Sequence, residues 1–153
     1  MTAREARAVG VGDPVPEREI GPVTQTDIVR FAGAGGDFNP LHHDPAFAEK
    51  AGFDTVIAMG QMQAGMLAAW LTDWCGIEHL RELDVRFLAP VRLGAVLRFT
   101  GEVTGAAELN GEPVAELALR AAVDTAEVAR ATAVVARGGV NGRSAHSPDE
   151  SLR

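Results

Sequence analysis

The hydrophobic and polar positions in the first half of the chain are typical of helices. After a proline-rich segment at 15–23 that suits an edge strand, Thr24 and Asp27 form a near capping box before apolar residues at helical spacing. This pattern predicts a helix that ends in the glycines at positions 33, 35 and 36. A second, short helix is expected at 46–51, directly after an Asp-Pro pair that is typical of a helix start.

One longer stretch, residues 60–75, is apolar or small at nearly every position. This composition predicts a helix that is buried on most sides and is about 24 Å long at 1.5 Å per residue. Cys75, the only cysteine, is expected to pack there as a small hydrophobic residue. We expect a sheet to approach the helix closely at its small residues, which are Ala64, Gly65, Ala68 and Ala69.

The second half of the chain has the alternating or Val- and Leu-rich segments of β-strands, at 80–88, 96–104, 114–124 and 128–137. In the third segment the apolar and charged residues fall on opposite faces, as in an antiparallel sheet that a helix covers on one side. Asn110-Gly111 predicts a hairpin turn. One long helix followed by four strands predicts an α+β domain in which a curved antiparallel sheet wraps the helix.

Length and composition fit one globular domain. With 153 residues, 46% hydrophobic and 23% charged, the chain predicts a single domain at 1–137 and a disordered tail at 138–153. No apolar run reaches the roughly 18 residues of a membrane span, and residues 1–10 lack a secretory signal, so we expect a cytoplasmic protein that does not enter the membrane. The net charge of −7 argues against binding nucleic acid.

The loop at 36–43 combines conformational restraint with a carboxylate and an imidazole. Pro40 excludes a regular helix and favours extended geometry at Asn39, so we expect an ordered, extended loop. On such a loop Asp37 and His42 converge on one water molecule, with His42 as a proton carrier near neutral pH. Asn39 is expected to hold the loop or the carboxylate. Because successive residues of an extended chain point to opposite faces, only one of the two adjacent histidines should enter the site.

These residues suit the addition of water to an α,β-unsaturated thioester. That reaction needs a base to activate water, an acid to protonate C2, and donors for the negative charge on the thioester oxygen. The first turn of the helix at 60–75 offers unpaired backbone N–H groups, and Gly60 lets a carbonyl approach closely. We expect no cofactor and no metal, since the nearby His and Asp residues lack a familiar zinc spacing. The expected catalytic residues are Asp37, His42 and Gly60, and the expected substrate-binding residues are Asn39, Met59, Gln61 and Met62.

The run Gly36-Asp37-Phe38-Asn39-Pro40-Leu41-His42 resembles the signature loop of R-specific enoyl-CoA hydratases and MaoC-like dehydratases. The resemblance extends over roughly residues 11–137. It implies the hot-dog fold, catalysis by the loop Asp and His, and an oxyanion donor at Gly60. It also implies an acyl thioester of coenzyme A or acyl carrier protein as substrate, bound near the subunit boundary of a dimer. The family commonly has His-Gly where this chain has Met59-Gly60.

Two other functions stay open at this point. A thioesterase on the same scaffold would use a carboxylate to activate water against the thioester carbonyl itself. A subunit of a heterodimer with a related chain would bind acyl groups without turnover. The intact Asp37 and His42 argue against this non-catalytic subunit, whereas Met59 keeps it open.

Overall fold

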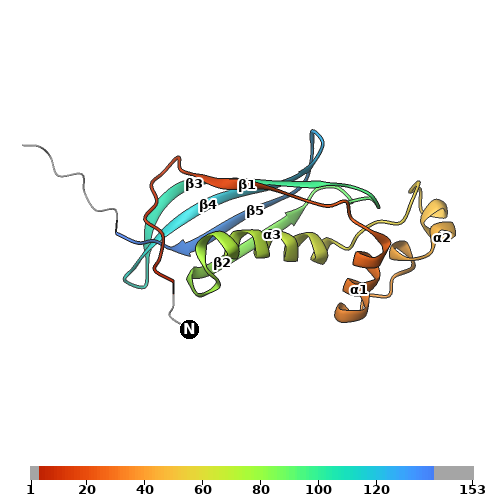
Figure 1. Cartoon of the computed structure of the whole chain (residues 1–153), viewed down its shortest axis with the longest axis horizontal. Helices are drawn as coiled ribbons and strands as arrows, with labels where there is room; N and C mark the ends of the chain where they lie inside the picture. Colours follow the sequence, from red (N-terminus) through yellow and green to blue (C-terminus); the bar gives the residue numbers. More distant parts are fainter. Residues whose placement is uncertain (1–3, 140–153) are drawn as a thin grey trace, which may run out of the picture.

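The computed structural model describes residues 4–139 of the chain. Most of the predicted tail, from position 140 onward, therefore lies outside the described residues. The elements follow one another in the order that the sequence pattern predicts, with an edge strand first, then the helices and then the other strands (Figure 1). They are β1 (Pro14–Ile20), α1 (Gln25–Gly35), η1 (Pro40–His42), α2 (Pro45–Lys50), α3 (Gly60–Cys75), η2 (Ile77–His79), β2 (Leu80–Phe87), β3 (Leu97–Leu109), β4 (Glu112–Val123) and β5 (Ala126–Ala136).

The five strands form one antiparallel sheet in the order β1-β3-β4-β5-β2, with α3 lying along one face (Figure 1). The β3–β4 hairpin turns at Asn110 and Gly111, which both have positive φ angles, as the Asn-Gly pair predicts. α1, η1 and α2 lie beyond the N-terminal end of α3 (Figure 1). The predicted fold class, a curved antiparallel sheet around one long helix, is confirmed.

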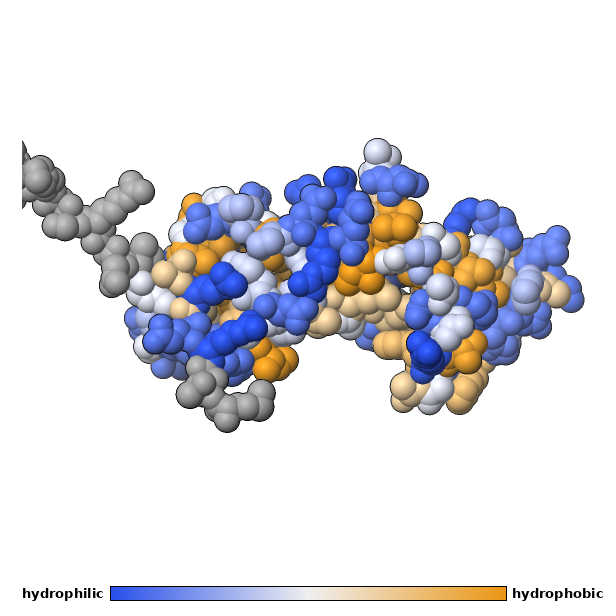
Figure 2. All heavy atoms as spheres, viewed as in Figure 1, coloured by the Kyte–Doolittle hydropathy of each residue, from blue (hydrophilic) through white to orange (hydrophobic). Residues whose placement is uncertain are grey.

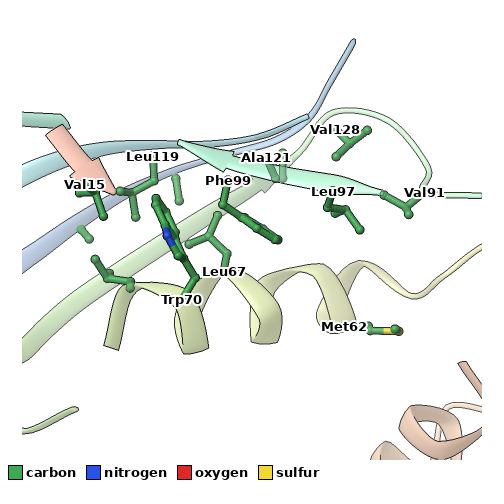
Figure 3. Packing of buried hydrophobic residues seen from close by; sticks show 14 of the residues in the cluster. Val15, Met62, Leu67, Trp70, Val91, Leu97, Phe99, Leu119, Ala121 and Val128 are labelled. Carbon is green, nitrogen blue, oxygen red and sulfur yellow. The ribbon is translucent and has the colours of Figure 1, made fainter. Parts of the chain in front are cut away.

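The core lies between α3 and the sheet. Trp70 stacks on Phe99 of β3 with ring centroids 5.8 Å apart, and the indole Nε1–H donates to the Pro16 carbonyl of β1 at 2.9 Å. Leu67 and Leu71 of α3 are completely buried against the same sheet face. Figure 3 shows the side chains of Leu67 and Trp70 reaching from α3 toward the strands. Each buried side chain of this size contributes about 1.5–3 kcal/mol, so this face fixes the position of α3.

The small residues of α3 do not pack into the core, which corrects the expectation that the sheet approaches closely at all four. Gly65 and Ala69 are exposed, and the half-buried Ala64 and Ala68 border an open hollow beside the edge strand β2. Small residues permit close approach but gain little from burial, so the larger apolar residues of the opposite side determine which face meets the strands. The outer face of α3 is therefore left open.

Two local details of the first half also differ from the predictions. α1 continues through Gly33 to Gly35 and ends at Gly36, which has the left-handed backbone (φ 69°) usual after a helix. The loop after it is not extended throughout, because residues 40–42 form a single 3₁₀ turn, η1. The Asn39 side chain caps this turn by accepting from the Leu41 N–H at 3.0 Å.

The two edge strands differ in how well they are protected. β1 carries Pro14 and Pro16, and its register with β3 shifts between Val15 and Arg18. Prolines and irregular pairing both prevent a further strand from adding to an edge. β2, at the opposite edge, pairs with β5 in unbroken register from Glu82 to Phe87. Within residues 4–139, no helix combines the length and apolarity needed to cross a bilayer.

The capping box of α1 gives a test of the helix start. Thr24 accepts from the Asp27 N–H at 3.2 Å. The Asp27 carboxylate in turn accepts from the Thr24 hydroxyl at 2.5 Å and from the Thr24 N–H at 2.9 Å, and these two hydrogen bonds lower the pKa of Asp27. We expect Thr24→Ala to lower the free energy of unfolding by about 0.5–2 kcal/mol. Thr26→Ala, an exposed position in the same helix, is the control, and both are measured by urea unfolding. Equal stability of the two variants would contradict the assigned cap.

Candidate active site

The imidazole of His42 is buried and fixed by a backbone carbonyl. Its Nδ1 lies 2.7 Å from the Ile57 oxygen, and only 10% of the side chain is exposed. Because a carbonyl can only accept, Nδ1 carries the proton of this hydrogen bond. In the neutral ring Nε2 then has a free lone pair, so the ring is oriented as a proton acceptor on its outer side.

The segment that carries this carbonyl is itself held on two sides. The Ile57 N–H donates to the Leu41 carbonyl at 3.1 Å, which links the segment to the residue before His42. The Ala58 N–H donates to the Val91 carbonyl at 2.7 Å, and Ile57 forms a bridge with Arg92. The segment is therefore paired like a short strand, and the acceptor for His42 does not depend on a free loop.

α1 supports the same histidine from another direction. Gln25, the first residue of α1, donates from its side-chain amide to the His42 carbonyl at 3.2 Å. The His42 N–H in turn donates to the Asn39 carbonyl at 3.0 Å within η1. Ring, carbonyl and N–H of His42 thus all have partners, which leaves Nε2 as the free polar atom of this residue.

Asp37 faces that atom. Its Oδ2 lies 3.6 Å from His42 Nε2, and its Oδ1 accepts from the Asn39 N–H at 3.3 Å. The distance of 3.6 Å is longer than a direct hydrogen bond. The carboxylate is 48% exposed, so the pair has one buried and one solvent-facing member. The structure brings together the two residues that the sequence predicts as a pair.

The adjacent histidine has a different environment. His43 is exposed, and its Nε2 lies 3.2 Å from the Phe38 carbonyl rather than near Asp37. Of the two adjacent histidines, only His42 lies beside Asp37, and His43 follows directly after the 3₁₀ turn. That only one of them enters the active site stays a prediction. Phe38 itself is 67% exposed, which leaves the loop beside Asp37 open.

The first turn of α3 begins three residues after Ile57. Its N-cap, Met59, is buried and makes no side-chain capping hydrogen bond. The amides of Met62 and Gln63 donate to the Met59 carbonyl, whereas the Gly60 and Gln61 amides have no acceptor among residues 4–139. These two amides are the unpaired donors that every helix start provides.

Phe87, the last residue of β2, covers Gly60. A Cβ at position 60 would lie 3.1 Å from two ring carbons of Phe87, tighter than ordinary packing. A side chain at position 60 is therefore disfavoured by a close neighbour and not by an unusual backbone angle. Gly60 thus lies against the end of an edge strand.

Two open hollows lie on either side of the outer face of α3. One, of about 470 Å³, lies between α1 and α3 and includes Met62, Met66 and Phe31. The other, of about 520 Å³, lies between α3 and β2 and includes Gln61 and Phe87. Both reach Phe31 and Gly65, and Figure 2 shows the surface notched between α3 and α1. Neither hollow is lined by Asp37 or His42.

Other titratable groups have structural roles. Burial raises the pKa of the Cys75 thiol, which fits its predicted place in the core. The Arg81 side chain holds the pKa of Glu112 below its usual range through two hydrogen bonds of 2.7 Å. Among residues 4–139 there is no group of three or more His, Cys, Asp or Glu side chains placed to hold a metal ion.

Sequence reasoning missed three residues that shape this region. Gln25 and Ile57 hold His42, and Phe87 covers Gly60. Ile57 and Phe87 act through a backbone carbonyl and an apolar ring, so neither has a side-chain type that marks a polar site. The sequence gives only a weak indication of the role of Gln25. This polar residue directly follows the N-cap of the helix that leads into the loop.

Comparisons with known proteins agree with this geometry. Residues 8–125 match the family described as MaoC like domain. An (R)-specific enoyl-CoA hydratase of Rhodospirillum rubrum is 35% identical over 86 residues, which cover 54% of this chain and 59% of that enzyme. The 3-hydroxyacyl-thioester dehydratase Z of Mycobacterium tuberculosis is 29% identical over 113 residues, covering 70% of this chain and 75% of that enzyme.

A solved structure supports the same relationship. The (R)-hydratase of Aeromonas caviae involved in PHA biosynthesis superposes with a TM-score of 0.73 and 27% identity, covering 87% of this chain and all of that one. The fold is thus the hot-dog fold of the R-hydratases, as the sequence predicted. The chain belongs to the MaoC-like dehydratase family. The predicted reaction class agrees with the names of these relatives.

The orientation of His42 can be tested directly. Because Nδ1 donates to Ile57, we expect the neutral ring to be the Nδ1–H tautomer, with Nε2 unprotonated. Long-range ¹H–¹⁵N correlation spectra of the labelled protein distinguish the two tautomers, and a His42→Ala sample assigns the signals. An Nε2–H tautomer for this ring would contradict the hydrogen bond.

Proposed function

We propose that the protein is an (R)-specific hydratase/dehydratase that interconverts 2-enoyl and 3-hydroxyacyl thioesters. One observation carries the proposal: the free Nε2 of His42 and the Oδ2 of Asp37 face each other at 3.6 Å. Two polar atoms at this separation can both reach one water molecule at normal hydrogen-bond distance. The relatives named as hydratases and dehydratases support the same reaction.

His42 and Asp37 have different roles toward that water molecule. As the water oxygen bonds to C3 of the enoyl group, Nε2 takes one of its protons, and the proton is then delivered to C2. The Asp37 carboxylate holds the water and stabilises the positive charge that the ring acquires meanwhile. The net change is addition of H and OH across the double bond, and the reverse sequence removes water from the 3-hydroxyacyl thioester.

The Gly60 amide is the proposed donor for the thioester oxygen. Negative charge builds on this oxygen while C2 awaits its proton, and an unpaired N–H at a helix start stabilises such charge. The free amides of Gly60 and Gln61 and the absence of a capping side chain on Met59 support this role. Met59, Gln61, Met62 and Asn39 remain the proposed neighbours of the substrate.

We further propose an acyl thioester of coenzyme A or of acyl carrier protein as substrate, and a homodimer as the working form. The open hollows beside α3 and the exposed loop at Phe38 support a site that a single copy leaves incomplete. A heterodimer with a related chain is the competing assembly. The cytoplasm is the proposed compartment, in keeping with the free thiol of Cys75.

The two histidines of the loop provide a matched test of the mechanism. We expect His42→Ala and Asp37→Asn each to lower kcat/KM for crotonyl-CoA hydration by at least roughly 10²-fold, because each removes a proton-handling group. His43→Ala, at the exposed neighbour, should keep near-normal activity. Both loss of the enoyl absorbance and release of free thiol are followed, because hydration and hydrolysis can each consume the substrate.

Each outcome of that assay has a meaning. Full activity of His42→Ala or Asp37→Asn, with the fold intact by circular dichroism, would reject the assigned pair. Release of free thiol from the thioester would instead show hydrolysis at the carbonyl, the reaction of a thioesterase.

Gly60 gives an independent prediction. Gly60→Ala places a methyl group against the Phe87 ring, so we expect the first turn of α3 to shift and kcat/KM to fall roughly 10- to 100-fold. Gly33→Ala is the control, because a Cβ there meets nothing within 4 Å. Equal activity of the two variants would show that the Gly60 amide does not contribute.

A further inference from the structure

The face of the sheet that points away from α3 carries a row of three arginines. Arg86 of β2 lies directly opposite Arg130 of β5, and Arg130 lies directly opposite Arg120 of β4. Directly opposite residues of neighbouring strands point to the same side of a sheet. The chain neighbours of Arg120, which are Leu119 and Ala121, are buried in the core beside α3, so the arginine row lies on the outer face (Figure 1).

The arginine row places like charges close together on a chain that is acidic as a whole. Neighbouring strands lie about 4.7–4.9 Å apart, so the three side chains leave the sheet within roughly 10 Å of one another. Like charges directly opposite one another destabilise a strand pair. The net charge of the chain is −7, so the row is not part of a generally basic protein surface. An anion bound at the row would relieve this repulsion.

One carboxylate holds two of the three arginines. Glu127 of β5 meets Arg120 with its Oε1 at 3.5 Å and accepts a hydrogen bond from Arg130 with its Oε2. The Glu127 side chain is only 24% exposed, whereas the side chains of Arg120 and Arg130 are 62% and 63% exposed. Within residues 4–139, no carboxylate lies within ion-pair distance of Arg86. The row and Glu127 together therefore keep two positive charges, with N–H groups of the guanidinium forks still free.

A hollow of about 360 Å³ lies beside the arginine row, and all three arginines line it. Small side chains leave this space, because Ala118 lies directly opposite Thr132 in the register next to Arg120 and Arg130. Asp84 of β2 lies directly opposite Thr132 on its other side and also lines the hollow. The volume falls within the range of roughly 300–1,000 Å³ that small-molecule sites have.

We propose that this hollow binds a small molecule that carries a diphosphate group. Guanidinium groups are planar forks whose N–H groups match two oxygens of one phosphate. Three forks and two uncompensated positive charges suit two linked phosphates better than a single carboxylate. The Thr132 hydroxyl and the Asp84 carboxylate offer hydrogen bonds to hydroxyl groups of the same ligand, such as those of a nucleoside diphosphate.

The hollow is separate from the proposed reaction centre. Asp37 and His42 belong to the loop and turn after α1, and Gly60 begins α3, whereas the hollow lies on the sheet face away from α3 (Figure 1). None of these three residues lines it. The proposal thus adds a second binding site to the protein, and it holds or fails independently of the proposed hydration reaction.

Titration calorimetry on the full chain at low salt tests for the ligand, with inorganic pyrophosphate and ADP as separate probes. We expect both to bind, and ADP to bind more tightly, because only ADP has hydroxyl groups for Thr132 and Asp84. Equal affinities would support the diphosphate site and assign it to free diphosphate. Failure of both probes to bind at millimolar concentration would overturn the proposal.

Arginine variants locate the binding to the row. We expect Arg130→Gln and Arg86→Gln each to weaken pyrophosphate binding roughly tenfold or more, because each removes a charge-assisted contact. Arg130→Lys keeps the charge but loses the fork, so it should weaken binding as well. Arg98→Gln is the matched control. Arg98 lies on the same outer face, between the buried Leu97 and Phe99, but does not line the hollow.

The variants separate a defined site from a diffuse positive surface. Equal weakening by Arg98→Gln and Arg130→Gln would show that only the overall charge of the face matters, and would overturn the site. Arg86 has no ion pair to lose among residues 4–139, so ligand-free Arg86→Gln should unfold at the wild-type temperature. If this folded variant kept wild-type affinity for pyrophosphate, the assignment of the ligand to the row would be wrong.

Discussion

The hydrogen bond from His42 Nδ1 to the Ile57 carbonyl is the constraint on which the site depends. It turns Nε2 toward Asp37, and it joins the loop after α1 to the segment that leads into α3. The segment around Ile57 is held by hydrogen bonds to residues 91–93. The position of the His42 ring therefore depends on this pairing as well as on its own loop. A strong carbonyl acceptor on one nitrogen also leaves the other nitrogen free for chemistry.

The helices and strands could be predicted from the sequence, because the spacing of apolar residues shows which positions of each element are buried. The bounds of the central helix, Gly60–Cys75, agree with the apolar stretch, and the Asn110-Gly111 turn is where the pattern requires it. The expectation that the sheet approaches α3 closely at its small residues was wrong, since Gly65 and Ala69 are exposed and Ala64 and Ala68 border an open hollow beside β2. A helix that is apolar on all sides does not by itself show which side meets a sheet, and the decisive residues are the large ones, such as Trp70.

The site was only partly predictable. Asp37 and His42 lie close together in the chain, so their pairing follows from the local loop and its proline. Ile57 and Phe87 meet the site through contacts that are distant in sequence and use a carbonyl and an aromatic ring. No composition or spacing marks such contacts, because almost any residue supplies a carbonyl and most aromatic residues are core. Asn39 is extended as predicted (φ −58°, ψ 128°), but residues 40–42 are not, because they form a 3₁₀ turn that the Asn39 side chain caps.

The packing of Phe87 on Gly60 connects the edge of the sheet with the proposed reaction centre. The ring belongs to an edge strand, whereas the glycine amide belongs to the proposed reaction centre. A change that displaces the end of this strand therefore also displaces the ring that lies against the first turn of α3. Substitutions at the sheet edge are thus expected to alter turnover without touching a polar residue of the site.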